Sequence, residues 1–249
     1  MDRNVLRLKL ALAAVLASVT IAVYAPVREF GFVNYDDNVY VTENPQVAAG
    51  LTVDSLAWSA TAFVNGNWHP LTLVSHMLDV SLFGLNPAGH HGMNLALHVV
   101  NVLLLFWLLA GTTLQPWPSA LVAALFAVHP LNVQTVAWIS ERKSLLSTGF
   151  WLLALLAHVG YRRRPNVAKY LLIVALAAAA LAAKPMAVTL PLTLVLFDVW
   201  PLAARPKGRS WVLPRDAREL GPLLALAGVC GVLTLLAQHA ASAIQSVTE

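Results

Sequence analysis

Long apolar stretches separated by short polar turns dominate the pattern of hydrophobic and polar positions along the chain. An apolar helix of about 20 residues spans the roughly 30 Å hydrocarbon core of a bilayer, and a shorter one crosses where the bilayer thins or flanking side chains snorkel. We therefore predict an all-α polytopic membrane protein with about seven transmembrane helices. The seven segments cover residues 8–27, 91–111, 119–139, 145–161, 167–183, 186–202 and 220–240.

The first segment raises the question of a signal peptide, because Arg3, Arg7 and Lys9 precede or open it. The sequence at Val23–Arg28 is a poor small-residue cleavage site, and the apolar run is long. We therefore favour an uncleaved membrane anchor.

Residues 28–90 form the first long connection, and their apolar content is too high for a flexible linker. Val53–Phe63 and Leu71–Phe83 predict two short helices on the membrane surface, with turns at residues 65–67 and 84–87. In the second of these segments the apolar residues recur at helical spacing, at Leu71, Val74, Leu78 and Leu82.

Composition agrees with a membrane protein, since 58% of the residues are hydrophobic and 11% are charged. In soluble domains about a quarter of the residues are charged. The net charge of +4 does not indicate a nucleic-acid partner, because the basic residues collect in short loops as membrane topology requires.

The distribution of Lys and Arg predicts a cytoplasmic N-terminus, since 12 of the 16 basic residues fall on one side of the seven segments. These are Arg3, Arg7, Lys9, Arg162, Arg163, Arg164, Lys169, Arg205, Lys207, Arg209, Arg215 and Arg218. The loop at residues 28–90 is then external and contains six acidic residues and one basic residue.

Asp36 and Asp37 are adjacent carboxylates in this external loop, close to Tyr35 and Tyr40. Acidic groups at a membrane edge are costly unless they face water, a cation or a reacting group. A carboxylate beside another one can act as a general base. The alternative is a simple turn, which Asn34 and its neighbours also favour.

Four further charges fall at two external corners of the predicted bundle, Glu141-Arg142-Lys143 and Lys184. Positive charge outside runs against the usual topology, and Arg and Lys bind phosphate oxygens well. We predict that Arg142, Lys143 and Lys184 form one anion site, with Glu141 as a substrate contact. Contact with ordinary phospholipid headgroups is the alternative.

Histidines and asparagines supply most other polar groups in apolar surroundings. His69, His76 and Asp79 share one helical face, and His91, Asn94, His98 and Asn101 form a stripe on the second span; His129 precedes Pro130 and predicts a kink. We expect these polar groups to form hydrogen bonds between helices. Substrate contact, for which His69 and His129 are the candidates, is one alternative, and metal binding is the other. We predict no metal site.

Six motifs together resemble the membrane half of the transmembrane O-mannosyltransferases with tetratricopeptide repeats and their bacterial relatives. They are Phe32-Val-Asn-Tyr-Asp-Asp-Asn-Val-Tyr-Val41, Trp68-His-Pro-Leu-Thr72, Leu82-Phe-Gly-Leu-Asn-Pro87, His129-Pro-Leu131, Ala137-Trp-Ile-Ser-Glu-Arg-Lys143 and Lys184-Pro-Met-Ala-Val-Thr-Leu-Pro191. The resemblance covers nearly the whole chain, in order.

This resemblance implies a GT-C-like helical bundle that moves a sugar, mannose or a similar one, from a polyprenyl-phosphate donor to a Ser or Thr hydroxyl of a protein, with inversion. It implies that the catalytic acid of the first external loop is Asp36 or Asp37; we expect Tyr35 to shield that side from water. No cofactor is required, because the leaving group is a monophosphate. Residues 1–249 would be a truncated transmembrane domain without its C-terminal repeat domain.

We expect a multi-pass protein of a bacterial inner membrane with a periplasmic active site, in contact with membrane lipids. Two other functions are open, a transporter or flippase of a lipid-linked anion and a non-catalytic membrane anchor. A transporter predicts ionisable side chains along a path through both membrane halves, whereas an anchor needs no acid pair that faces cations.

Overall fold

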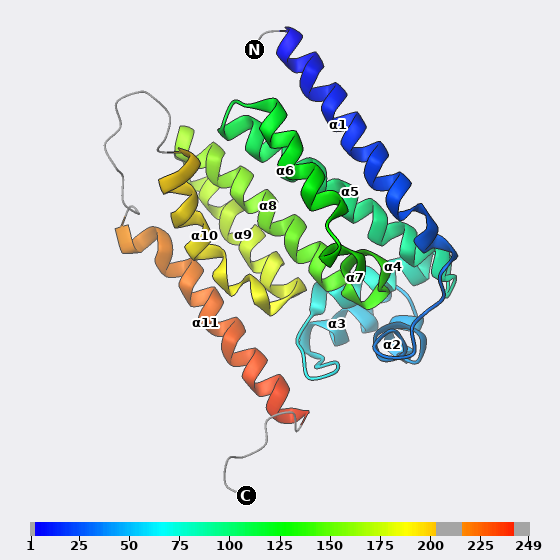
Figure 1. Ribbon diagram of the computed structural model, residues 1–249. Helices are drawn as coiled ribbons and strands as arrows, with labels where there is room; N and C mark the ends of the chain where they lie inside the picture. The colour runs from blue at the N-terminus through cyan, green and yellow to red at the C-terminus, as the bar shows by residue number, and fades with distance from the viewer. Residues whose placement is uncertain (1–2, 203–215, 242–249) are drawn as a thin grey trace, which may run out of the picture.

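The computed structural model describes residues 3–202 and 216–241 and has no β-strand within those ranges. Long helices run side by side, and shorter elements gather at one end of them (Figure 1). The bundle consists of α1 (Arg3–Tyr24), α5 (Pro87–Thr112), α6 (Pro116–Val128), α8 (Arg142–Arg163), α9 (Val167–Ala183), the shorter α10 (Leu190–Phe197) and α11 (Asp216–Ala240).

All seven predicted apolar segments are largely helical, which confirms a polytopic all-α membrane protein, but among the described residues fewer than the predicted seven have the length and composition of a span. By length and composition, five helical stretches in the described part of the chain are able to cross a membrane: Arg3–Glu29, Pro87–Thr112, Ile139–Arg163, Pro185–Leu202 and Glu219–Ala240. The bent pair α6 and α7 (Leu131–Ala137) makes a sixth if it is one span. Helix α9 is apolar but has only 17 residues.

The predicted kink lies at His129-Pro130, where α6 and α7 meet at 64°. Proline disfavours the helical conformation of the residue before it. His129 is accordingly extended, at φ −63° and ψ 132°. The prediction of a kink is thus confirmed.

The connection between α1 and α5 folds into a cap of short helices. It contains η1 (Ala25–Glu29), η2 (Asn38–Thr42), α2 (Pro45–Ala48), α3 (Val53–Thr61) and α4 (Pro70–Phe83). A capping box between Thr52 and Ser55 begins α3, and Pro70 is the first residue of α4. The two predicted short helices are confirmed.

The cap has its own apolar core, formed by Tyr40, Val41, Val47, Val64, Leu73, Met77 and Ile139. Helix α4 directs His76 and Asp79 inward, whereas Leu78 and Leu82 of its predicted apolar face are exposed. The cap is therefore fixed to the bundle through buried polar groups as well as apolar ones.

The polar stripe of α5 ties neighbouring helices together. His98 Nε2 donates to the carbonyl of Ala127 at 2.9 Å, and Asn101 Nδ2 donates to the carbonyl of Leu145 at 2.9 Å. Asn94 Nδ2 donates to the carbonyls of Val136 and Trp138. Interhelical bonding is thus confirmed for His98, Asn94 and Asn101.

The remaining short elements are η3 (Ile139–Glu141), η4 (Pro185–Thr189) and η5 (Asp198–Leu202). The start of α1 and the end of α8 lie at the end of the bundle opposite the cap (Figure 1). The basic groups at the start of α1 and at Arg162–Arg164 are therefore far from the cap. Arg205, Lys207, Arg209 and Arg215 lie outside the described residues.

Candidate functional site: an acid–cation cluster under the cap

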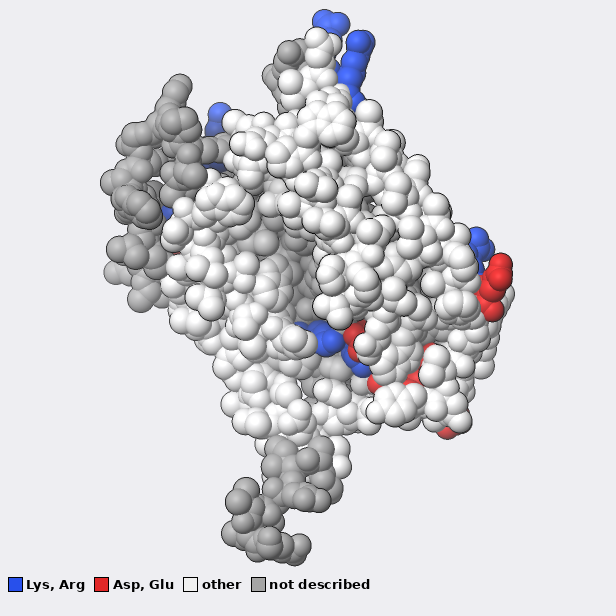
Figure 2. Space-filling model, viewed as in Figure 1, with Lys and Arg blue, Asp and Glu red and all other residues white. Residues whose placement is uncertain are grey.

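Four charged side chains from three segments meet where the cap rests on the bundle. Lys143 Nζ lies 3.6 Å from Asp36 Oδ2 and 3.4 Å from Glu141 Oε1, and Lys184 Nζ lies 3.2 Å from Glu141 Oε2. We call Asp36, Glu141, Lys143 and Lys184 the acid–cation cluster. Basic and acidic side chains lie side by side in a hollow of an otherwise largely uncharged face (Figure 2).

The two adjacent aspartates have different environments. Asp36 is 14% exposed at its side chain and accepts a hydrogen bond from Asn65 Nδ2 at 2.9 Å. Asp37 has no exposed surface; it accepts from the backbone N–H groups of Val33 at 2.8 Å and Ser140 at 2.9 Å, and from the Ser140 hydroxyl. Asp36 is thus the carboxylate that a second molecule can reach, whereas Asp37 holds the loop onto η3.

The backbone at the start of α8 and after α9 brings Glu141, Lys143 and Lys184 to the same place. Glu141 ends η3 and Arg142 begins α8, so Glu141 and Lys143 lie at a helix N-terminus beside the loop. Lys184 has an extended backbone, φ −154° and ψ 127°, between α9 and Pro185. Its Nζ also donates to the Ser144 hydroxyl at 2.7 Å.

Arg142 does not share the exposure of the two lysines. Its guanidinium has no exposed surface and donates to Ser75 Oγ at 2.9 Å, to Asp79 Oδ2 at 2.7 Å, to the His90 carbonyl at 2.9 Å and to the Asn94 side chain. The predicted set of three cations is therefore divided: Lys143 and Lys184 lie in the cluster, and Arg142 points into the protein.

Aromatic side chains surround the Lys143 ammonium. Its Nζ lies 5.1 Å from the ring centre of Tyr40 and 5.8 Å from that of Trp138. Both distances are within the range of cation–π attraction. Tyr35 is exposed and its ring lies 5.7 Å from that of Trp138. These rings form one apolar wall beside the charges.

His69 lies behind this wall and is buried. Its Nδ1 is 3.4 Å from the Tyr40 hydroxyl, and the two rings are stacked. Burial, followed by the nearby positive charges of Lys143 and Lys184, lowers the pKa of His69 from 6.5 to about 3. The imidazole is therefore neutral at ordinary pH and acts as a hydrogen-bonding group.

His129 is not brought to the cluster. It is exposed at the α6–α7 bend, where its Nδ1 accepts from the Leu131 backbone N–H at 3.2 Å. Among the described residues this is its one recorded side-chain hydrogen bond. Its position suits local capping of the bend.

Sequence reasoning missed the partners that organise the cluster. Ser140 binds Asp37, Ser144 binds both Glu141 and Lys184, and Asn65 binds Asp36. Ser144 lies one residue after Lys143, and this position next to the charged corner could have indicated it as a partner of the cluster. Asn65 carried no such signal, because 29 residues separate it from Asp36.

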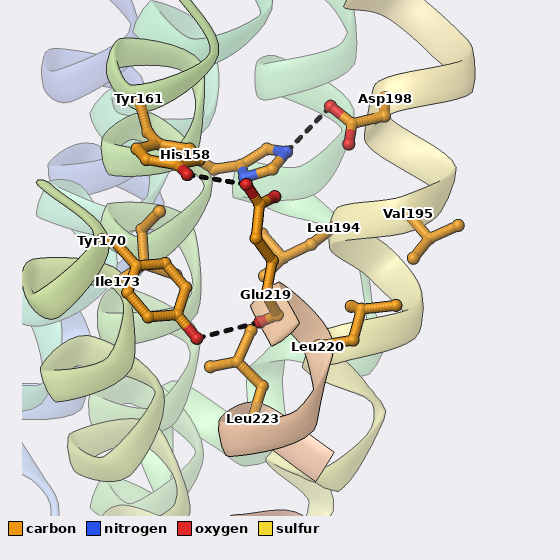
Figure 3. A pocket seen from close by; sticks show the side chains of 10 residues that line it. All are labelled: His158, Tyr161, Tyr170, Ile173, Leu194, Val195, Asp198, Glu219, Leu220 and Leu223. Atoms are coloured by element: carbon orange, nitrogen blue, oxygen red, sulfur yellow. Dashed lines mark hydrogen bonds and ion pairs between the residues drawn. The ribbon is translucent and has the colours of Figure 1, made fainter. Parts of the chain in front are cut away.

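A second polar cluster lies between α8, α9, α10 and α11, near the opposite end of the bundle (Figure 3). His158 Nε2 and Arg162 Nε lie 2.9 and 2.8 Å from Asp198 Oδ1. Glu219 accepts from Tyr161 through its carboxylate and from Tyr170 through its carbonyl. The cavity between these side chains measures about 30 Å³ and has room for a water molecule only, which indicates a structural role for the cluster.

Fold and site together define a polytopic, all-helical membrane protein with a partly exposed acid–cation cluster at one end. No family model and no solved structure matches the chain. Curated relatives do match, and they are protein O-mannosyl-transferases. The chain is 34% identical to Tmtc1 of Drosophila melanogaster over 193 residues, which are 74% of this chain and 22% of that protein.

Two further relatives extend this similarity. Tmtc2 of Drosophila melanogaster is 30% identical over 73% of this chain and 21% of its own length, and human TMTC1 is 31% identical over 59% and 18%. The chain is thus homologous to the TMTC protein O-mannosyltransferases, and it spans about a fifth of the length of these relatives.

Proposed function

We propose that this chain carries the sugar-transfer site of an inverting glycosyltransferase. The donor is a polyprenyl-phosphate sugar, with mannose or a similar hexose, and the acceptor is a Ser or Thr hydroxyl of a protein. The proposal rests on one observation above all: a partly exposed carboxylate, Asp36, lies beside the nearly buried Lys143 and the partly exposed Lys184 in a hollow where the cap meets the bundle.

Asp36 is the general base of the proposed reaction. Its carboxylate takes the proton of the acceptor hydroxyl while the hydroxyl oxygen attacks the anomeric carbon. The bond from that carbon to the phosphate oxygen breaks on the opposite face, so the configuration inverts. Asn65, which donates to Asp36 Oδ1, leaves Oδ2 directed to the side of Lys143.

Lys143 and Lys184 bind the donor phosphate in this proposal. The leaving phosphate gains negative charge as the bond breaks, and fixed cations stabilise that charge most in the transition state. Glu141 forms an ion pair with each lysine and holds them in place before the donor arrives. Arg142, buried against Asp79, supports this segment from beneath.

The placement of the charges favours transfer over the two other functions. A transporter of an anion needs ionisable groups along a path through the bundle. In the described part of the chain, the charged clusters lie at the cap and near the opposite end, next to the C-terminal part of α8. A passive anchor would not need a carboxylate and two cations in one hollow.

We also propose that the cap faces the periplasm or an equivalent external compartment. The basic ends of α1 and α8 lie away from the cap, and positively charged segments stay in the cytoplasm. The lipid-linked donor would then keep its tail in the bilayer and present its phosphate at the cap.

The direct test supplies membranes that contain the protein with a radiolabelled mannosyl-phosphoryl polyprenol and a peptide rich in Ser and Thr. We expect label on the peptide, and a loss of about 10²–10⁴-fold in rate for Asp36→Asn, because the amide cannot take the proton. Asp54, an exposed aspartate of α3 outside the cluster, provides the matched control Asp54→Asn.

Donor binding is measured separately, because Asp36→Asn should leave the phosphate site intact. Transfer by Asp36→Asn at the unmodified rate would remove Asp36 from the mechanism. No transfer from any polyprenyl-phosphate hexose by the unmodified protein, with donor binding also absent, would overturn the proposed function.

A further inference from the structure

A second group of titratable side chains lies buried where α4, α5 and α8 meet. His76 and Asp79 are three residues apart on one face of α4, and His90 lies in the first turns of α5. One donor atom from each of these three residues lies within 4.8 Å of the other two. All three side chains have no exposed surface. We call His76, Asp79 and His90 the buried triad.

The hydrogen bonds of His90 fix its ring nitrogens. Nε2 lies 3.0 Å from the Gly84 carbonyl, which can only accept, so Nε2 carries the proton. In the neutral ring, Nδ1 then carries no proton. It lies 3.4 Å from Asp79 Oδ2 and has no hydrogen-bond partner. Oδ2 already accepts from the Arg142 guanidinium, so His90 Nδ1 keeps an unshared electron pair in a site that water does not reach, which is unfavourable unless another group binds it.

His76 also lacks hydrogen-bond partners, and it lacks them at both ring nitrogens. Asp79 Oδ1 has no hydrogen-bond partner either. A buried polar atom without a partner is destabilising, because it has given up its hydrogen bonds to water and gained none in the protein. Native proteins satisfy the large majority of such atoms, so four of them within one triad, with His90 Nδ1 included, indicate that a ligand binds there.

We propose that His76, Asp79 and His90 bind one Zn²⁺ ion. Two imidazoles and a carboxylate are ligands that zinc prefers. The His90 ring already has the second contact of a zinc ligand, because its far nitrogen donates to a backbone carbonyl. Donor atoms of a tetrahedral zinc ion lie about 3.4 Å apart, so the side chains draw together by roughly 1.4 Å or less on binding.

Arg142 is the group that could oppose such an ion, and its geometry leaves room for one. Its guanidinium binds Asp79 through Oδ2, at 2.7 Å, whereas Oδ1 of the same carboxylate is unpartnered. One carboxylate can therefore serve the guanidinium with one oxygen and the metal with the other. Asp37 adds a second negative charge near His90.

The zinc ion would act on structure, because the triad is closed to solvent. It would join α4 to α5 and, through Asp79, fix Arg142 at the start of α8. Arg142 lies between Glu141 and Lys143 in the chain. The ion would thus hold the acid–cation cluster from beneath without contact with any substrate.

The test uses the full chain, purified in detergent with an affinity tag that lacks histidine, stripped with a chelator and then given ZnCl₂ alone. Bound zinc is counted by mass spectrometry after gel filtration, and thermal unfolding is followed with and without zinc. We expect about one zinc per chain and a higher unfolding temperature with zinc.

Three substitutions sharpen the result. His76→Leu should abolish zinc binding, and His76→Cys should keep it, because a thiolate also binds zinc. His91→Leu changes an equally buried neighbour outside the triad and should keep zinc. Without zinc, His76→Leu should be at least as stable as the parent, since it removes two unpaired buried nitrogens.

Cobalt keeps the proposal testable if the variants fail to fold. Co²⁺ bound to the unmodified chain should give the intense visible absorption of a tetrahedral site, and zinc should displace it. The proposal is overturned if the parent retains no zinc and shows no cobalt spectrum, or if His76→Leu binds as much zinc as the parent.

Discussion

The different roles of the adjacent aspartates lead to a prediction about stability. Asp37→Asn keeps one oxygen, which can still accept from the Ser140 N–H and hydroxyl groups. The new amide NH₂ then faces the Val33 N–H, now 2.8 Å from Asp37 Oδ2, and two donors oppose each other. The variant therefore loses one hydrogen bond to a charged group and weakens the others.

The magnitude follows from that loss. A hydrogen bond to a charged group contributes about 1.5–3 kcal/mol to stability. Val33 lies at the surface, so its N–H can turn to water and no further burial cost is added. For a chain of this size, about 1.5–3 kcal/mol lowers the unfolding temperature by roughly 3–12 °C.

Asp36→Asn is the matched comparison. Its amide oxygen can still accept from Asn65, and it loses a partly exposed ion pair with Lys143 at 3.6 Å. Such pairs contribute less than about 1 kcal/mol. We therefore expect this variant to lose transfer and keep its stability.

Cys230 provides the assay, because it is the single cysteine of the chain and is 3% exposed. A thiol-reactive dye in detergent solution reports its exposure as the protein is heated. The reasoning is refuted if Asp37→Asn unfolds at the temperature of the parent, or if Asp36→Asn is the less stable variant of the two.

Three further predictions concern topology, donor binding and pH. Cysteines placed at Asn38 and Arg163 should be labelled from opposite sides of the membrane, and labelling from one side contradicts the proposed topology. Lys184→Met should weaken donor binding about ten- to a hundredfold in a lipid-phosphate binding assay, through loss of a charge-assisted contact; unchanged affinity would place the phosphate elsewhere. The pKa of His69 is lowered from 6.5 to about 3, so its contribution to stability is complete above pH 6.5 and is lost as the pH falls toward 3. Unfolding temperatures of His69→Gln should therefore fall less than those of the parent over that range, and equal falls would assign the acid sensitivity to other groups.

How much of the cluster was predictable depends on the distance between partners in the chain. Glu141, Lys143 and Lys184 were predicted as a group because all lie at corners between apolar segments. The contacts of Arg142 with Asp79 and of Asp37 with Ser140 join residues 63 and 103 positions apart, and no local pattern indicates them. The burial of Arg142 was therefore not foreseeable.

The sequence by itself determined the helical segments, the bend at His129-Pro130 and the short helices of the cap. These depend on local properties: the length of an apolar run, the restricted backbone of proline and its predecessor, and capping side chains. The tertiary structure alone decided which of Asp36 and Asp37 is accessible and how His76, Asp79 and His90 converge. Those outcomes depend on how α4 and the first loop dock on α5 and α8, because burial and the choice of hydrogen-bond partner belong to the packed chain and not to any one segment.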